Sequence, residues 1–205
     1  MREVAQQVYV VTARWGDRYS AFTASSVTSI SLRPPLIMVS VDRSSLSHDP
    51  LVNSEYFIVI LLSADDVELA KLMAEPLDPK VKLERAGFRE GVEGPLPGVP
   101  RPYLVLRRYA VYDGGDHSIV LGEVVGGSVE GVRCPLLYRR RSYTTIAECQ
   151  GKAGGFLNTM KALSASPSAG SYMYFSGFHL THFTSTSSKP ASPITFITAS
   201  LVYTG

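Results

Sequence analysis

The chain has 205 residues, 45% of them hydrophobic, and a formal net charge of +2 at pH 7. This length and apolar content suffice for one domain with a substantial core. The small net charge gives no reason to expect nucleic acid or an anionic membrane as a partner. The longest strongly apolar run, residues 56–62, is too short to span a bilayer, and the amino terminus lacks a secretory leader pattern. We therefore expect a soluble, cytoplasmic protein.

Strand signals dominate up to residue 146. Five segments rich in Val, Ile, Leu and Tyr are bounded by Gly, Pro, Asp or Ser, as strands commonly are. They are residues 6–14, 35–42, 56–63, 103–113 and 117–131. The Asp-Gly-Gly sequence in residues 112–118 predicts a tight hairpin between the last two. Five strands with few helices between them favour an antiparallel barrel.

Two segments have helical patterns. In residues 63–74, Ser63 can cap the amino terminus, two aspartates follow it, and apolar residues recur on one face. Residues 78–88 predict a second, short helix that ends near Gly87. From residue 147 onward the chain is rich in Ser, Thr, Gly, Pro and Tyr, carries few charges and lacks a clear period. We expect a domain over residues 1–146 and an extension of unknown order over residues 147–205.

Several chemistries are absent from the sequence. It contains no dinucleotide-binding, Walker, zinc-protease or α/β-hydrolase motif. Cys134 and Cys149 have neither the number of a disulfide framework nor the spacing of a zinc or redox motif, so we predict two unpaired thiols. His179 and His182 lie in a strand-like sequence, in which positions three apart face opposite sides. We therefore expect no metal site.

Three motifs follow one another in an informative order. They are TASSVTSISLRPPL at residues 23–36, VDRSSLSH at residues 41–48 and GDHSIVLGEV at residues 115–124. With the segments between them, they resemble the flavin reductase-like, FMN-binding split-barrel proteins. The resemblance runs from about Val8 to Tyr143. It implies a mainly β fold, an antiparallel Greek-key split β-barrel with a few short helices, and leaves the C-terminal extension unexplained.

The resemblance assigns the first motif to the flavin ring. Thr23, Ala24, Ser25 and Ser26 match the loop at the pyrimidine edge of the isoalloxazine. Donors aimed at that edge would favour the negative charge that develops on the reduced ring. A strand with half of its hydroxyl groups in water is the alternative interpretation of this run.

The second motif resembles a phosphate-binding segment. Its residues are Asp42, Arg43, Ser44, Ser45 and Ser47. The Arg43 guanidinium and the serine hydroxyls would bind phosphate oxygens where a short helix begins. An ordinary helix cap with a solvated arginine is the alternative.

The remaining correspondences involve a lysine and a histidine. Lys82 matches a family lysine but is followed by Leu83, where the family usually has an aromatic residue. Ile58 and Ile60 stand where the family often has Gly and Asn. His117 matches a histidine beside the flavin, where nicotinamide would stack, and is the predicted catalytic residue. Its alternative role is that of a solvated histidine at the end of a hairpin.

The implied activity is NAD(P)H-dependent reduction of flavin, by hydride transfer from NADH or NADPH to FMN, with FAD as a second possible flavin. The implied partners are a second copy of the chain, in a homodimer, and an oxygenase component that receives reduced flavin. Two alternatives stay open from the sequence. One is an electron-transfer flavoprotein or ferric reductase that retains FMN, and the other is a flavin-binding module without turnover.

Overall fold

The computed structural model describes residues 3–131, 133–149, 173–176 and 179–182. Its main element is a seven-stranded sheet in the order β3-β2-β6-β9-β10-β5-β4, in which every neighbouring pair is antiparallel. The strands are β2 (Tyr9–Trp15), β3 (Arg18–Ala24), β4 (Val27–Leu32), β5 (Pro35–Asp42), β6 (Tyr56–Leu61), β9 (Tyr103–Gly114) and β10 (His117–Ser128).

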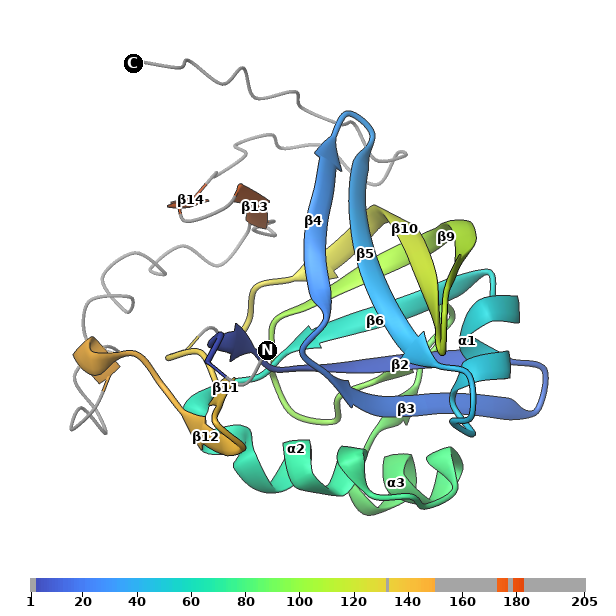
Figure 1. Ribbon diagram of the computed structural model, residues 1–205, viewed down its shortest axis with the longest axis horizontal. Helices are drawn as coiled ribbons and strands as arrows, with labels where there is room; N and C mark the ends of the chain where they lie inside the picture. Colours follow the sequence, from blue (N-terminus) through green and yellow to red (C-terminus); the bar gives the residue numbers. More distant parts are fainter. Residues whose placement is uncertain (1–2, 132, 150–172, 177–178, 183–205) are drawn as a thin grey trace, which may run out of the picture.

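The sheet curls without closing. Its two edge strands, β3 and β4, are consecutive in the chain and are connected through residues 25–26, yet they do not pair with each other. The β4–β5 hairpin projects beyond the rest of the sheet (Figure 1). This architecture confirms the predicted antiparallel split barrel with a few short helices.

Short helices accompany the sheet, and the small strands form three separate small sheets within the described residues. The helices are α1 (His48–Asn53), α2 (Val67–Ala74) and α3 (Pro79–Arg85), with 3-10 turns η1 (Ala64–Asp66) and η2 (Ala147–Cys149). The small strands are β1 (Gln6–Gln7), β7 (Arg89–Glu90), β8 (Pro95–Leu96), β11 (Leu137–Arg139), β12 (Ser142–Thr144), β13 (Met173–Ser176) and β14 (His179–His182). Within the described ranges, no helix is long and apolar enough to cross a membrane.

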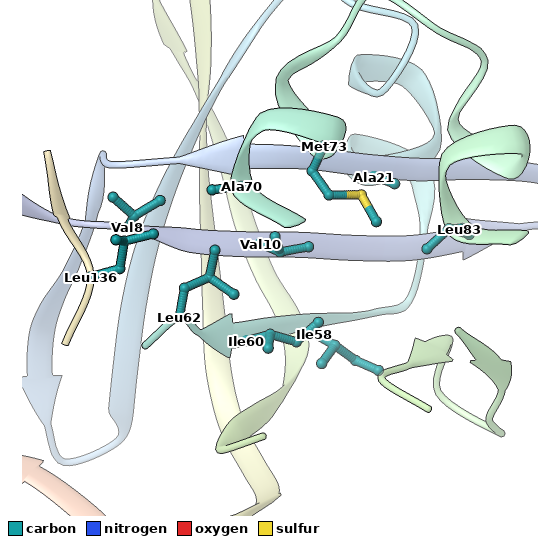
Figure 2. Packing of buried hydrophobic residues seen from close by; sticks show 10 residues of the cluster. All are labelled: Val8, Val10, Ala21, Ile58, Ile60, Leu62, Ala70, Met73, Leu83 and Leu136. Carbon is teal, nitrogen blue, oxygen red and sulfur yellow. The ribbon is translucent and has the colours of Figure 1, made fainter. Parts of the chain in front are cut away.

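Strands β2 and β6 are buried on both faces for most of their length because each face packs against a different core. Val10, Ile58 and Ile60 lie on the face covered by α2 and α3, where Met73 and Leu83 also pack (Figure 2). Residues of the other parity turn into the interior of the curved sheet. That second core consists of Val11, Ala13, Ala24, Val39, Val41, Leu51, Phe57, Val59, Leu106 and Val120. Burial on both faces explains the uninterrupted apolar sequence of β6.

Gly122 in the third motif is required by packing. A Cβ at this position would lie 2.5 Å from Cζ of Phe57 and 2.7 Å from Cβ of Leu106. Both neighbours are fully buried, so neither can move aside without opening the core. The glycine therefore lets β10 approach the interior closely.

Both helix predictions are confirmed. Ser63 forms a capping box with Asp66, whose Oδ2 accepts from the Ser63 hydroxyl at 2.7 Å and from its amide at 2.9 Å. Asp78 caps α3, and Gly87 follows that helix with φ of +68°. The Asp-Gly-Gly hairpin between β9 and β10 is also confirmed, with Gly115 at φ of +80°.

The prediction for the cysteines is wrong. Cys134 and Cys149 form a disulfide, with Cα atoms 5.9 Å apart and a sequence separation of 15. The β11–β12 hairpin lies between the two cysteines and brings them together. Their spacing in the sequence therefore matches no short cysteine motif. The side chains of His179 and His182 lie outside the described residues, as does most of the predicted extension over residues 147–205.

Candidate functional site

One face of the β5–β10 ladder brings the predicted site segments together. Alternate residues of a strand share a face, and residues directly opposite in an antiparallel pair share it too. The face carries Met38, Ser40 and Asp42 of β5, opposite Leu121, Ile119 and His117 of β10. The start of the second motif therefore lies directly opposite the histidine of the third.

The first motif joins this face at its other end. Ser25 and Ser26 lie between β3 and β4, outside the paired positions of both strands, so the ladders do not use their amides. The Ser40 hydroxyl donates to Oγ of Ser26 at 2.7 Å, and the Ser40 amide donates to the Ser26 carbonyl at 3.3 Å. These bonds fix the loop against β5.

A cavity of about 320 Å³ opens beside Ser25 and Ser26. It is lined by Gln6, Gln7, Tyr9, Ser25, Ser26, Val27, Thr28 and Met38. Apolar surface from Tyr9, Val27 and Met38 suits the face of an aromatic plate, whereas the serines and glutamines suit its polar edge. The lining therefore fits the chemistry of an isoalloxazine ring.

The second motif places a cation at the far end of β5. The Arg43 Nη2 lies 2.9 Å from Oδ2 of Asp113, and both side chains are partly solvated. The Arg43 amide donates to the carbonyl of Asp116 at 3.1 Å. A guanidinium at the surface of the β9–β10 turn is accessible to an anionic group.

Asp42 is held by its own turn. Its Oδ1 accepts from the hydroxyl and the amide of Ser44, each at 2.7 Å. These two bonds lower the pKa of Asp42, and the bond from the Ser44 hydroxyl has the larger effect. The nearby His117 and His48 act in the same direction. Asp42 is therefore an anion that organises the loop, so its negative charge would repel a phosphate.

The three serines of the second motif have different environments. Ser44 is exposed and Ser45 is half-buried, so their hydroxyls are near solvent. Ser47 is fully buried: its hydroxyl donates to the Ala21 carbonyl at 3.2 Å and accepts from the Ala21 amide at 3.1 Å. Ser47 thus links the start of α1 to the edge strand β3.

Two residues of the first motif face away from the cavity. The Thr23 hydroxyl donates to the carbonyl of Ala70 in α2 at 2.6 Å. Ala24 is buried in the interior core. Neither residue lines the cavity with its side chain, and flavin contacts by them stay a prediction.

The Lys82 side chain likewise makes its hydrogen bonds within the fold. Its Nζ donates to the carbonyls of Met73 and Glu75, at 3.0 and 3.3 Å, at the end of α2. The residue is 4% exposed, and burial lowers the pKa of its ammonium group. The structure therefore gives Lys82 a helix-capping position, while its predicted flavin contact stays a prediction.

His117 is half-exposed at the start of β10. Its Nδ1 lies 2.7 Å from Oδ1 of Asp116, which orients the ring. A second histidine lies close by, since His48 Nε2 is 2.9 Å from the hydroxyl of Ser118 and its Nδ1 is 2.9 Å from Asp49. His48 thereby connects α1 to the strand that carries His117.

The cavity residues Tyr9 and Met38 and the carboxylate of Asp113 were missed by sequence reasoning. Strand positions such as Met38 have the same sequence pattern as ordinary core residues, and only the register of β5 against β4 and β10 reveals their face. By contrast, Ile58 and Ile60 are buried beneath α2 and α3, which removes their side chains from any surface ligand.

Comparison with known proteins supports the resemblance. A family model described as "Flavin reductase like domain" matches residues 1–147. The chain is 33% identical to "Flavin reductase (NADH)" of Kitasatospora aureofaciens over 132 residues, covering 62% of this chain and 68% of the relative. It is 32% identical to "NADH:riboflavin 5'-phosphate oxidoreductase" of Streptomyces pristinaespiralis, covering 71% of this chain and 84% of the relative.

Solved structures have the same fold. Flavin reductase HpaC complexed with NADP⁺ superposes with a TM-score of 0.65 at 30% identity, covering 72% of this chain and 94% of the other. The NADH:FAD oxidoreductase SgcE6 of Streptomyces globisporus C-1027, in complex with NAD and FAD fragments, has a TM-score of 0.65 at 27% identity, covering 74% and 90%. Because the family model spans well over half of the sequence, this chain belongs to the flavin reductase-like domain family.

Proposed function

We propose that this chain is an NAD(P)H-dependent flavin reductase that accepts FMN or FAD. The observation that carries the proposal is the shared face of β5 and β10. A cavity suited to an aromatic plate lies beside Met38 of β5, the half-exposed His117 of β10 lies opposite Asp42 at the other end of this face, and the exposed Arg43 directly follows β5. An elongated molecule with a ring at one end and a phosphate at the other has the chemistry to match this arrangement.

Each part of the face has one task in this proposal. Ser25 and Ser26 donate to the polar edge of the ring, and Tyr9 and Met38 contact its apolar surface. Arg43 binds the phosphate. Bound flavin supplies the acceptor for a hydride from nicotinamide, and no protein nucleophile is needed.

His117 acts by position. From the start of β10 it limits where a second ring can stack, which favours a productive face-to-face arrangement. Asp116 keeps the imidazole in one orientation through the 2.7 Å contact. Since the contact is between adjacent residues of one turn, the histidine is positioned before any ligand binds.

The flavin and its recipient are inferred from relatives. One relative is named as an oxidoreductase of riboflavin 5'-phosphate and another as an "NADH-dependent FAD reductase", which supports both flavins. A third, 32% identical and from Thermus thermophilus, is named the reductase component of 4-hydroxyphenylacetate 3-monooxygenase. We therefore propose that reduced flavin leaves this chain for a separate oxygenase component.

An anaerobic stopped-flow experiment tests the activity. The protein with FMN or FAD is mixed with NADH or NADPH, and the flavin absorbance is followed. Rapid bleaching that requires the protein supports the reductase and gives the nucleotide preference. Flavin that binds but stays oxidised with both nucleotides would contradict it and favour a binding module. Reduction of flavin that never leaves the protein would favour an electron-transfer flavoprotein.

Exposed apolar residues on the sheet support a homodimer. Tyr112, opposite Ile119 on the β9–β10 ladder, is 55% exposed, and Ile30 on the projecting β4–β5 hairpin is 51% exposed. Such apolar residues on a sheet face are typical of surfaces that a partner covers. Light scattering after gel filtration tests this: a dimer that Tyr112→Glu converts to a monomer is expected, and a monomeric wild-type protein would contradict it.

A cytoplasmic location is part of the proposal, supported by the nicotinamide nucleotides named for the relatives. The disulfide points the other way, because disulfides persist mainly in oxidising compartments. Thiol trapping in freshly lysed cells distinguishes the two: reduced Cys134 and Cys149 support the cytoplasm, and a fully formed disulfide contradicts it.

A further inference from the structure

Arg43 is held at both ends by one turn. Its amide donates to the Asp116 carbonyl at 3.1 Å, and its guanidinium lies 2.9 Å from the Asp113 carboxylate. Asp113 and Asp116 flank the two glycines that connect β9 to β10. The proposed phosphate-binding group therefore already has an anionic partner within the protein.

Asp113 is oriented for this contact. Its Oδ1 accepts from the Gly115 amide at 2.8 Å, which leaves Oδ2 to face Arg43. The Gly115 amide and then Arg43 lower the pKa of Asp113, so the group is a carboxylate at neutral pH. A carboxylate and a phosphate present similar oxygens to a guanidinium and compete for the same donors.

We propose that Asp113 competes with the flavin phosphate for Arg43 and thereby determines how strongly the site prefers phosphorylated flavins over riboflavin. The inference rests on the proposed function. Phosphate binding exchanges one anion for another on Arg43. Because the contact with the Asp113 carboxylate must be broken, FMN binds less tightly than it would to a free Arg43. The return of Asp113 to Arg43 also favours flavin release, as suits an enzyme that delivers reduced flavin elsewhere.

Solvent keeps this exchange small. The Arg43 and Asp113 side chains are 43% and 75% exposed, and an exposed ion pair is stabilised weakly. Asp113 therefore adjusts affinity without blocking the site. A contact of this strength corresponds to a change of about threefold to fivefold in a dissociation constant.

Asp113→Asn tests the proposal with little disturbance of the turn. Asparagine keeps a side-chain oxygen for the Gly115 amide but loses the charge that faces Arg43. Dissociation constants for FMN and riboflavin are measured by fluorescence titration. We expect FMN to bind about threefold to fivefold more tightly and to dissociate more slowly, while riboflavin affinity is unchanged.

Asp116→Asn is the matched control. It removes the same charge from the same turn, but its carboxylate lies against His117 and not Arg43. A smaller change in the FMN-to-riboflavin ratio is expected. An equal change would overturn the proposal by showing a general effect of charge, and so would an unchanged ratio in Asp113→Asn.

Introducing Asp113→Asn into the Arg43→Ala variant tests the competition for Arg43 separately from the flavin reductase activity. The effect of Asp113→Asn should vanish in that background, because the competing donor is gone. If wild-type protein prefers FMN through Arg43 but Asp113→Asn changes nothing, the competition is wrong and the reductase stands. If wild-type protein neither binds flavin nor oxidises NAD(P)H, both fail.

Discussion

His117 on β10 lies directly opposite Asp42 on β5, at the last paired position of an antiparallel ladder. This pairing brings Asp42 and His117, which are 75 positions apart in the sequence numbering, to one end of the barrel. A histidine in this place is adjacent to the proposed phosphate-binding loop, and it lies on the same sheet face as Met38, which lines the cavity proposed for the ring.

The pairing predicts the behaviour of His117→Ala. We expect slower flavin reduction with flavin affinity largely retained, since the ring would position nicotinamide and not flavin. Anaerobic stopped-flow rates and flavin titrations on the same variant measure the two effects. Asp116→Asn serves as a companion, because it keeps the ring and removes only the charge of its partner at 2.7 Å, so its reduction rate should fall less. An unchanged rate in His117→Ala would rule out the positioning role.

Arg43→Ala should weaken FMN more than riboflavin, which lacks the phosphate. Loss of a charge-assisted contact costs about 1.5–3 kcal/mol, and riboflavin affinity should stay near that of the wild type. Fluorescence titration with both flavins gives the comparison. Arg14→Ala is the control, because Arg14 forms an exposed ion pair with Glu90 on another part of the surface. Equal losses for FMN and riboflavin in Arg43→Ala would contradict the assignment.

The fold was largely predictable because its determinants are local. Short stretches of sequence determine the helix caps at Ser63 and Asp78 and the turns that contain glycine. The site was predictable only as motifs. Which side of a motif faces a ligand depends on how the motif packs in the fold: the Ser47 hydroxyl lies against β3 and the Thr23 hydroxyl against α2. The disulfide could not be predicted, since its geometry depends on a hairpin and not on spacing.

Ser47→Ala should lower the stability of the fold. Phosphate binding should be retained, because the neighbouring residues of the loop provide it. The substitution leaves the Ala21 amide and carbonyl without their buried partner, which costs about 1–3 kcal/mol. Urea unfolding measures this. Ser44→Ala, on an exposed residue of the same loop, should change stability by about 0.5 kcal/mol or less. If Ser47→Ala unfolds like the wild type but binds FMN poorly, its role is in phosphate binding.

Lys82→Ala should also be a stability variant. Two carbonyls at the end of α2 lose a charged donor, at a cost of about 1.5–3 kcal/mol, while Lys80→Ala on the exposed face of α3 should have little effect. Flavin affinity of the folded variant should be unchanged. A stable variant that loses flavin would instead support the ligand role implied by the family resemblance.

The pH dependence adds a second readout for Lys82. Its pKa is lower in the folded protein than the ordinary 10.5, so between the two values the unfolded chain binds more protons. Stability of the wild-type protein should therefore gain from Lys82 as pH rises through that window. Comparing unfolding free energies across alkaline pH should show this increment in the wild type and its absence in Lys82→Ala.

The disulfide between Cys134 and Cys149 should stabilise the fold. A cross-link that closes a loop of this size stabilises a fold by about 3 kcal/mol, so Cys134→Ser with Cys149→Ser should lower stability by roughly that amount. Reductant should bring the wild type to the level of the double variant and leave the variant unchanged. Equal stability of the wild type with and without reductant would show that the thiols do not pair.

The same cross-link should influence the flavin site. The loop that it closes contains β11, which pairs with β1, and Gln6 and Gln7 of β1 line the cavity beside Ser25 and Ser26. Loosening this loop reduces the support of one cavity wall, so flavin affinity should fall in the double variant even where the barrel stays folded. Titration with riboflavin isolates this effect, because riboflavin makes no phosphate contact with Arg43. Unchanged riboflavin affinity would show that the cavity wall holds without the disulfide.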